Sequence, residues 1–492
     1  MTAIPIVDVF AGPGGLNEGF SSLLDAHGSP VFRTANSFEI DDEAVNTLRL
    51  RAALRRIRLA TGTIPGVYYD LLRGRRNIAQ LEASSEFAAA FKDAEREVRK
   101  LRLGAQTRAE SDAQIRESLK GSGDGPWALV GGPPCQAYSL AGRSRRVNDP
   151  DFVSDEKHVL YREYLHILQE HQPTVFVMEN VKGMLSSQHD GGLVFQKILD
   201  DLRSPADGLE YEIRSFLLEG SDPGPKDFVL RSEDFGVPQR RHRVILLGVN
   251  RTTGLGEHER LRSTSNVVTV DDAIGDLPAI RSMISPRSRD SEATFLDSRT
   301  RGQLLASYPV STRRFPLGAP FVSSASVHGP DSLRAWLCDD SIGGVVHHES
   351  RAHMASDLVR YAYLAAKASE SLFPKVNELR GDLAPAHTNA SREDAPFADR
   401  FRVQRADRPS TTVVSHIAKD GHYYIHPDPD QARSLSVREA ARLQTFPDNY
   451  YFAGSRTDQY RQVGNAVPPW LARQLGASVA KLLGAEVDAE RI

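Results

Sequence analysis

Cysteine is scarce in this chain, with only Cys135 and Cys338 among 492 residues. Two cysteines cannot build a disulfide framework, so the fold must depend on a hydrophobic core, and the low count fits a reducing cytoplasm. Long apolar runs are also missing, because no stretch approaches the roughly 18 residues of a membrane-spanning helix. The first residues lack the basic start and apolar stretch of a signal peptide. We therefore expect a cytoplasmic protein that does not associate with membranes.

An excess of positive charge is absent too, since the net charge is -3. The overall charge gives no indication of nucleic-acid binding, but phosphate contacts depend on local clusters of charge. Arginines cluster at four places, and the clusters at residues 55–58 and 73–76 are typical of solvated surface. The other two, at residues 143–146 and 240–243, adjoin the motifs described below and are therefore candidates for function.

Short apolar runs alternate with amphipathic stretches throughout the segment 1–250. This pattern predicts an α/β fold with a doubly wound, mostly parallel sheet. Helices are expected at residues 16–26 and 156–170. The expected strands are residues 4–10, 31–38, 127–132, 174–179, 211–218 and 243–249.

The texture of the sequence changes after residue 250. Residues 251–405 are rich in Ser, Arg, Pro and Asp, and apart from a helix expected around 355–368 they predict a separate, irregular domain inserted into the first. Compact patterns return at 406–492, with helices expected at 437–443 and 470–483, so this segment should complete the first domain. Within the first domain, residues 71–126 are charged and rich in helix formers, which predicts a helical insertion.

A glycine-rich turn, Ala11-Gly-Pro-Gly-Gly15, follows the first expected strand and precedes a helix. Glycines let a ligand approach the backbone, and a helix N-terminus offers free amides, although many such turns serve packing alone. Glu39 closes the next strand, where a carboxylate can hold both hydroxyls of a ribose. The two features together favour a nucleoside-containing cofactor over a purely structural turn.

A cysteine lies just past another strand end, in Gly131-Gly-Pro-Pro-Cys135. A free cysteine is usually a buried structural residue. Two preceding prolines favour a functional one, because they stiffen the loop and remove amides from any strand pairing. Glu179, which ends the following strand, could be a helix cap or a surface acid. Because neighbouring strand ends converge in such a sheet, we expect Cys135 and Glu179 to face one pocket.

The chain resembles the DNA cytosine-5 methyltransferase family. The resemblance covers residues 1–250 and about 405–485, and an ordered set of motifs is far more specific than any one of them. The motifs are Phe10-Ala-Gly-Pro-Gly-Gly15, Glu39, Pro133-Pro-Cys-Gln136, Glu179-Asn-Val181, Gln239-Arg-Arg-His-Arg243 and Gln462-Val-Gly-Asn-Ala-Val-Pro468. The resemblance implies that residues 1–250 form a Rossmann-like catalytic and cofactor-binding domain and that 251–405 form the target recognition domain. It also implies that 406–492 return to the catalytic domain.

The resemblance implies methylation of carbon 5 of cytosine in a specific sequence of double-stranded DNA. The Cys135 thiolate would attack carbon 6 of the ring, so that carbon 5 can accept a methyl group. Glu179 would hydrogen-bond the exocyclic amine and N3. Arg241 and Arg243 would steady the base and the flanking phosphate. Since the target atom is stacked inside the duplex, the base must be flipped out.

The methyl donor implied by the resemblance is S-adenosylmethionine, with S-adenosylhomocysteine as product and no metal. Phe10 would lie near the adenine, Glu39 would bind the ribose, and Asp70 is the candidate for the acid that contacts the adenine amine. The full set of expected cofactor residues is Phe10, Gly12, Gly14, Gly15, Glu39, Ile40, Asp70, Pro134, Leu160, Asn465 and Val467. The expected DNA contacts are Gln136, Ser139 and Gln239.

Two other functions stay open. One branch of the family methylates cytosine in transfer RNA, but that branch lacks a large recognition domain. A catalytically silent DNA-binding regulator would not need Cys135, Glu179 and both arginines. We therefore expect an active enzyme of a restriction-modification or phage-defence system, acting on the DNA of a bacterial or archaeal nucleoid. Its expected partners are double-stranded DNA and a cognate restriction endonuclease or defence-system proteins.

Overall fold

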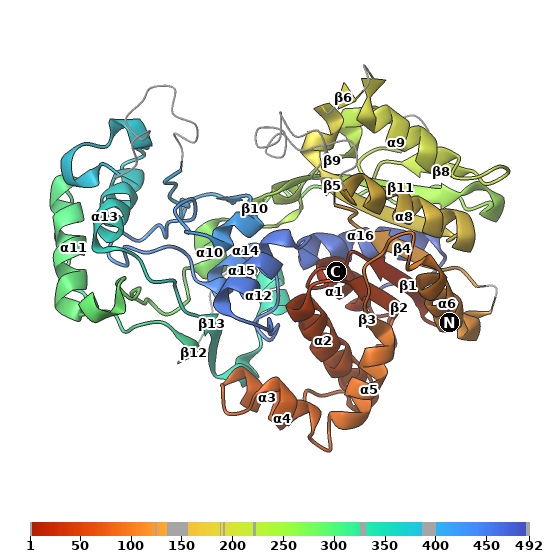
Figure 1. Ribbon diagram of the computed structural model, residues 1–492, viewed down its shortest axis with the longest axis horizontal. Helices are drawn as coiled ribbons and strands as arrows, with labels where there is room; N and C mark the ends of the chain where they lie inside the picture. The colour runs from red at the N-terminus through yellow and green to blue at the C-terminus, as the bar shows by residue number, and fades with distance from the viewer. Residues whose placement is uncertain are drawn as a thin grey trace.

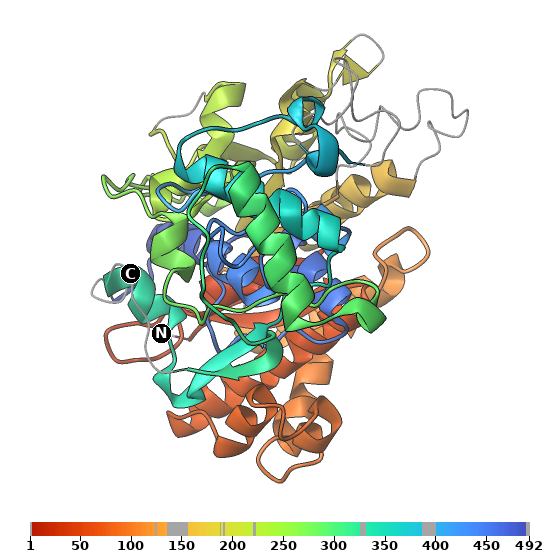
Figure 2. The same ribbon diagram turned by 90° about the vertical axis from the view of Figure 1, so that its left-hand side faces the viewer.

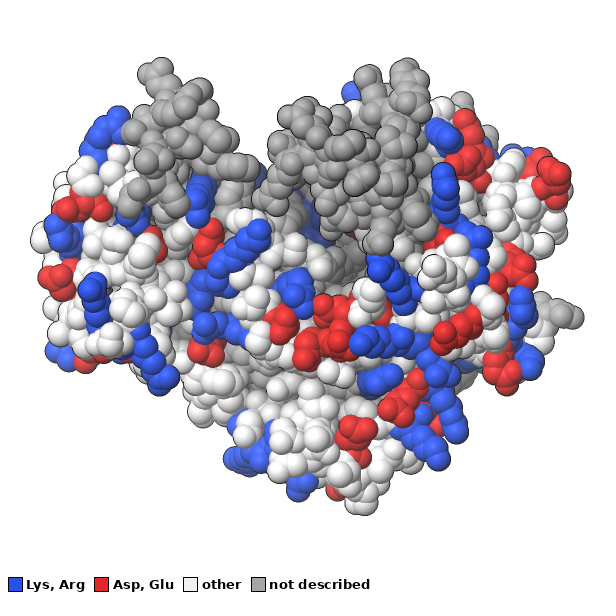
Figure 3. Space-filling view, viewed as in Figure 1, with Lys and Arg blue, Asp and Glu red and all other residues white. Residues whose placement is uncertain are grey.

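The computed structural model describes residues 2–123, 125–134, 156–186, 188–189, 192–219, 223–324, 331–385 and 400–488. The expected site residues Cys135, Gln136 and Ser139 lie outside the described residues, as does the arginine cluster at 143–146. The chain forms two bodies, one built around a large sheet and one around α11 and α13 (Figure 1). On the face shown in Figure 3, Lys and Arg side chains are spread over both bodies.

The large sheet runs in the order β3-β2-β1-β4-β5-β11-β8, with β9 paired to β11. Strands β1 to β5 pair in parallel, whereas β11 is antiparallel to its three neighbours. The predicted α/β fold class is therefore confirmed. The bounds are β1 Ile4–Val9, β2 Phe32–Glu39, β3 Val98–Lys100, β4 Ala128–Gly131, β5 Val175–Val181, β8 Tyr211–Arg214, β9 Val229–Arg231 and β11 His242–Asn250.

Helices cover both faces of this sheet, which explains why its central strands read as continuous apolar runs. One face is covered by α1 (Gly15–Ser21) and α16 (Pro469–Leu482), and the other by α6 (Arg108–Leu119), α8 (Glu156–His171) and α9 (Val194–Arg203). Leu471 and Leu475 of α16 share a core with Leu16 and Phe20 of α1. The C-terminal segment thus completes the domain that the N-terminal segment begins.

The order of the strands determines where a ligand can bind. β1 lies at the centre, with β2 on one side and β4 on the other, so the crossover connections diverge at the carboxyl end of β1. In doubly wound sheets, ligands bind in the crevice at this point. Because β1, β2, β4 and β5 are parallel, the residues that follow all four strands meet at one edge of the sheet. These are the residues that carry the motifs.

Residues 71–126, predicted to be a helical insertion, contain the short strand β3 as well as helices. β3 extends the sheet by pairing with β2, and α6 packs on the sheet with Ile115 fully buried in the main core. The helices α4 (Ile78–Glu82) and α5 (Ala88–Glu97) share a separate core on one side of the sheet. Its other members come from α2 (Asp42–Thr61), α3 (Gly66–Leu72) and β13 (Gly344–His348). A three-residue strand between charged helices is too short to show a period of two.

The second body contains α11 (Glu292–Leu305) and α13 (Ala355–Ser369), which lie side by side (Figure 2). Its core includes Phe295, Leu358 and Tyr361 from these helices. The hairpin β12 (Ala319–Ser323) and β13 (Gly344–His348) and the helix α12 (Asp331–Leu337) connect it to the sheet body. Ile342 and Val346 pack into the core around α2.

The second body does not begin at residue 251, where the sequence analysis places the start of a separate domain. Residues 251–277 pack on the sheet body: His258 is within 2.9 Å of the Ser215 carbonyl oxygen, and the Leu261 amide donates to the Phe216 carbonyl oxygen. The helix α10 (Val270–Ile274) packs on α14 (Val437–Leu443) in a shared core. The polar composition of 251–277 conceals this, because only a few apolar residues make the contact. We therefore place the start of the second body near residue 278.

Among the described residues, no helix is both long and apolar enough to cross a membrane.

Candidate active site

The glycine-rich turn between β1 and α1 adopts left-handed backbone conformations, with φ of 56° at Phe10, 56° at Gly12 and 90° at Gly14. A side chain at Gly14 would collide with Leu48, since an added Cβ would lie 2.7 Å from Cδ2. At Gly12 the same added Cβ would meet nothing within 4 Å. The turn is therefore closely packed on its inner side and open at Gly12, where a ligand can approach the backbone.

Glu39 lies beside this opening, at the carboxyl end of β2. Its Oε2 accepts a hydrogen bond from the Gly12 amide at 2.7 Å, and its Oε1 accepts from the amides of Ile40 and Asp41 at 2.8 and 2.9 Å. The side chain of Ile40 is 52% exposed next to it. A fixed carboxylate, an open glycine backbone and an exposed apolar side chain fit the ribose and the adenine of a nucleoside cofactor.

Other expected cofactor residues reach this edge from distant parts of the chain. Gly15 lies against the backbone of Val467, which is 8% exposed, and Asn465 is exposed at the end of α15 (Arg456–Asn465). Pro134 is half-buried after β4, and Leu160 is half-buried on α8. The described residues contain no group of three or more His, Cys, Asp or Glu arranged to hold a metal ion.

Asp70 lies away from this cluster. It is on α3, and its carboxylate forms ion pairs with Arg75 and Arg76 at 3.4 and 3.9 Å. The strand beside Glu39 is β3, and the residue that follows it, Leu101, donates its amide to the Glu39 carbonyl oxygen. The structure therefore brings Leu101, and not Asp70, next to Glu39. The contact of Asp70 with the adenine amine stays a prediction.

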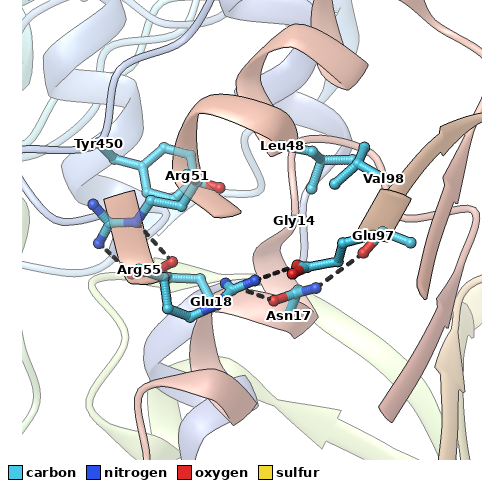
Figure 4. Close-up of a pocket in the computed structure, with 10 residues that line it drawn as sticks. Gly14, Asn17, Glu18, Leu48, Arg51, Arg55, Glu97, Val98 and Tyr450 are labelled. Atoms are coloured by element: carbon cyan, nitrogen blue, oxygen red, sulfur yellow. Dashed lines mark hydrogen bonds and ion pairs between the residues drawn. The ribbon is translucent and has the colours of Figure 1, made fainter. Parts of the chain in front are cut away.

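A buried polar network of side chains from α1, α2 and the C-terminal segment lies next to the glycine turn (Figure 4). Arg51 pairs with Glu18 at 2.5 Å and lies over the ring of Tyr450, whose hydroxyl donates to the Pro13 carbonyl oxygen at 2.5 Å. Burial opposes a charge on Glu18, but Arg51 keeps its pKa below the usual value. Tyr450 thus fastens the turn to the C-terminal segment.

A second ion pair extends this network. Arg55 donates to Glu97 at 2.5 Å and to Asn17 of α1 at 3.1 Å, and Arg56 pairs with Glu97 as well. The cluster at 55–58, taken from the sequence as solvated surface, therefore contributes Arg55 to the interior. Sequence spacing gives no signal for these contacts, because the partners lie on separate helices that only the fold brings together.

The second half of the site lies at the ends of β4, β5 and β11. Nε of Arg243 is 2.7 Å from Oε1 of Glu179, and both side chains are largely buried. An added Cβ at Gly132 would lie 2.8 Å from Oε2 of Glu179, so only glycine lets the carboxylate approach this loop. Nδ2 of Asn180 donates to the Pro133 carbonyl oxygen at 3.1 Å. Glu179, Arg243 and the chain that leads to Cys135 are thus held together.

Gln239 does not fit the expected role of a DNA contact. Its side chain is fully buried, Nε2 donates to the Leu443 carbonyl oxygen at 3.0 Å, and Oε1 accepts from the Val413 amide at 2.7 Å. Both ends of the amide are therefore occupied inside the protein. Arg241 is buried as well, with 3% exposure, and its guanidinium donates to backbone carbonyl oxygens. Of the two expected arginines, only Arg243 lies beside Glu179.

Comparison with known proteins agrees with this geometry. The family model described as C-5 cytosine-specific DNA methylase matches residues 109–481. The Type II methyltransferase M.Bpa9945I of Bacillus paralicheniformis is 33% identical over 97% of this chain and 99% of its own length. M.AgeI of Thalassovita gelatinovora, also a Type II methyltransferase, is 29% identical over 74% of this chain and 85% of its own length.

A solved structure shows the same fold. It is described as a DNA modification methyltransferase encoded within a prophage (E. coli), and it matches 98% of this chain and all of its own with a TM-score of 0.55 at 18% identity. The fold and the sheet-edge site define a methyltransferase. The chain belongs to the C-5 cytosine-specific DNA methylase family and is a DNA cytosine methyltransferase.

We expect Glu39→Ala to weaken binding of S-adenosylmethionine by about 10- to 100-fold, because hydrogen bonds to a charged group contribute about 1.5–3 kcal/mol. Calorimetric titration of the cofactor into the variant measures this. Asp42→Ala is the matched control, since Asp42 is an exposed acid slightly further along the chain, paired with Lys100. DNA affinity should stay unchanged in both variants. An unchanged cofactor dissociation constant for Glu39→Ala would place the ribose elsewhere.

Proposed function

We propose that this chain methylates carbon 5 of cytosine within a specific sequence of double-stranded DNA, with Cys135 as the nucleophile and with Glu179 and Arg243 holding the flipped base. The observation that carries the proposal is the Glu179–Arg243 pair at 2.7 Å, beside the Gly132-Pro133-Pro134 loop that leads to Cys135. This pair puts a carboxyl group and a guanidinium beside the loop that leads from β4 to the nucleophile. A carboxyl group there can accept a hydrogen bond from the exocyclic amine of a cytosine and, in its acid form, donate one to N3.

The residues around Gly12 fit S-adenosylmethionine, which supplies an electrophilic methyl group when bound. Glu39 would hold the ribose hydroxyls, and Ile40 would cover one face of the adenine. Phe10 lies in the turn itself and packs partly against the main core. Asn465 and Val467 would close the pocket from the C-terminal segment.

In the proposed reaction, a bond forms between the Cys135 sulfur and carbon 6, and ring electrons move toward carbon 5. The Glu179 carboxyl group donates its proton toward N3 and thereby stabilises the negative charge that the added thiolate brings onto the ring. Arg243 keeps Glu179 in place and supplies a positive charge beside the base. After carbon 5 has been methylated, it loses its proton to solvent, and the bond between Cys135 and carbon 6 breaks to restore the thiolate. Sequencing that maps 5-methylcytosine in DNA from cells expressing this protein tests the proposal, which fails if no site is methylated.

We expect Glu179→Gln to slow methyl transfer by roughly 10²–10³-fold, because an amide cannot transfer a proton toward N3 as a carboxyl group can. Single-turnover kinetics at saturating DNA measure the rate. Glu233→Gln is the matched control, because Glu233 is also a buried acid with a basic partner, His242 at 2.8 Å. Its rate should stay within a few-fold of the wild type. A similarly small effect for Glu179→Gln would remove Glu179 from the chemistry.

The biological role follows from the relatives named above. Because both are Type II methyltransferases, we propose that this chain is the modification enzyme of a restriction-modification or defence system. A cognate restriction endonuclease would then recognise the same sequence, and the enzyme would act in the cytoplasm on nucleoid DNA. The separate body around α11 and α13 supports DNA over the transfer-RNA alternative, because it supplies a recognition surface that the RNA branch lacks.

A further inference from the structure

We propose that Arg241 is a positioning residue that fastens the catalytic domain together across the recognition insertion, and that it does not contact DNA. The inference rests on the proposed function, since it assigns a task to one of two arginines expected at the base. Chain segments on either side of the insertion must meet to complete one active site. Arg241 lies where they meet.

The hydrogen bonds of the Arg241 guanidinium lead to the far side of the insertion. Nη1 donates to the carbonyl oxygens of Val413 at 2.7 Å and Gly464 at 3.3 Å, and Nη2 donates to that of Asn465 at 3.4 Å. These acceptors belong to two segments: the chain just before η11 (Ser415–Ala418), and the end of α15. One guanidinium therefore holds both segments against the start of β11.

The neighbouring residues show the same division between inner and outer positions. β10 (Gln239–Arg240) pairs in parallel with β14 (Ser410–Thr411), between the two bodies in Figure 1. Gln239 points inward with Arg241 and binds Val413 and Leu443, whereas Arg240 is exposed. Gln239 thus accepts a hydrogen bond from the amide of Val413, and Arg241 donates one to the carbonyl oxygen of the same residue.

Burial argues against a phosphate contact by Arg241. A residue that neutralises a DNA phosphate must present its guanidinium at the surface, but Arg241 is 3% exposed. Desolvation, followed by the positive charge of Arg243, lowers the pKa of Arg241 to about 9. The guanidinium is still mostly charged at neutral pH, and its charge strengthens the bonds to the carbonyl oxygens.

Arg241 affects the cofactor pocket because its guanidinium binds the carbonyl oxygen of Asn465. Loss of the guanidinium would leave buried carbonyl oxygens without donors and would release the end of α15. Val467, two residues further along the chain, would then no longer be fixed against Gly15. We expect the Michaelis constant for S-adenosylmethionine to rise about tenfold in Arg241→Met, with kcat within about threefold of the wild type.

The salt dependence of DNA binding separates this role from a phosphate contact. Each phosphate neutralised contributes about 0.9 to the slope of log affinity against log salt concentration. We expect the slope for Arg241→Met to equal that of the wild type. A slope lower by about 0.9, or an unchanged Michaelis constant for the cofactor, would overturn the inference. The slope is measured by binding alone, so this result does not depend on whether the chain methylates carbon 5.

Arg240→Met is the matched control, because it removes the same charge from the exposed neighbour. Its Michaelis constant for S-adenosylmethionine should match the wild type, and an equal rise in both variants would overturn the inference. Arg241→Lys, which keeps a charged donor, should recover most of the cofactor affinity. If the Arg241 variants do not fold, phenylglyoxal labelling of the wild type decides. Arg241 should resist modification both with and without DNA. If Arg241 is labelled and DNA suppresses the labelling, the positioning role is refuted.

Discussion

Replacing Cys135 with alanine should abolish methyl transfer and leave the affinity for S-adenosylmethionine within a few-fold of the wild type. The thiolate is the only group expected to add to carbon 6, and alanine offers no nucleophile. The proposed cofactor contacts lie at the ends of β1 and β2, around Gly12 and Glu39, where this substitution should change nothing. The loop should also keep its course, because Asn180 holds the Pro133 carbonyl oxygen shortly before position 135.

Two measurements check this expectation. Single-turnover transfer to duplex DNA reports the chemistry, and a duplex with 5-fluorocytosine at the target should trap the wild type covalently but not Cys135→Ala. Cys338→Ala is the control for loss of a thiol. Burial, followed by the charge of Asp448, raises the pKa of Cys338 to about 12, so it remains a thiol and its removal should leave the rate unchanged. Turnover by Cys135→Ala would exclude it as the nucleophile.

The sequence predicts most of the sheet, because strands buried on both faces leave continuous apolar runs. The run at 174–179 forms most of β5, and the run at 243–249 lies within β11. Helix α14 has the predicted bounds, 437–443, because Ser436 caps its first turn and Glu439 completes the capping box. β3 was not predicted, since its pairing partner β2 is separated from it by several helices and its own short sequence has no apolar pattern.

The motif residues that lie at strand ends meet at one edge of the sheet. Glu39 and Glu179 do so because parallel strands bring their carboxyl ends to one edge, and Arg243 does so because it lies at the start of the antiparallel strand β11. Gln239 and Arg241 do not. Their side chains face inward because β10 pairs with β14, which lies beyond the whole recognition insertion. No local pattern in the sequence reveals a pairing between strands that an entire domain separates. In the sequence, the buried Arg241 therefore looks like a member of a surface cluster of arginines.

Exchanging residues 278–405 for the equivalent segment of a family member with another target should transfer that enzyme's recognition sequence to this chain. The catalytic pocket presents the same chemistry to any cytosine, so discrimination must come from side chains that reach base edges in a groove. The body around α11 and α13 has its own core, with Phe295, Leu358 and Tyr361, and can carry such side chains as a unit. Mismatched base pairs cost about 1–3 kcal/mol each, so methylation at the original site should fall by about 10²-fold or more.

The junction at 278 is what distinguishes this exchange from one that begins at 251. Residues 251–277 belong to the sheet body, where Asp276 forms a buried ion pair with Arg442 at 2.6 Å and Ser478 donates to the Glu259 carbonyl oxygen. Exchanging only 251–277 is therefore the control, and it should leave the target sequence unchanged. Methylation mapping of both chimeras gives the answer. If the folded, active 278–405 chimera kept the original target, or if the 251–277 chimera changed it, recognition would lie outside the body built on α11 and α13.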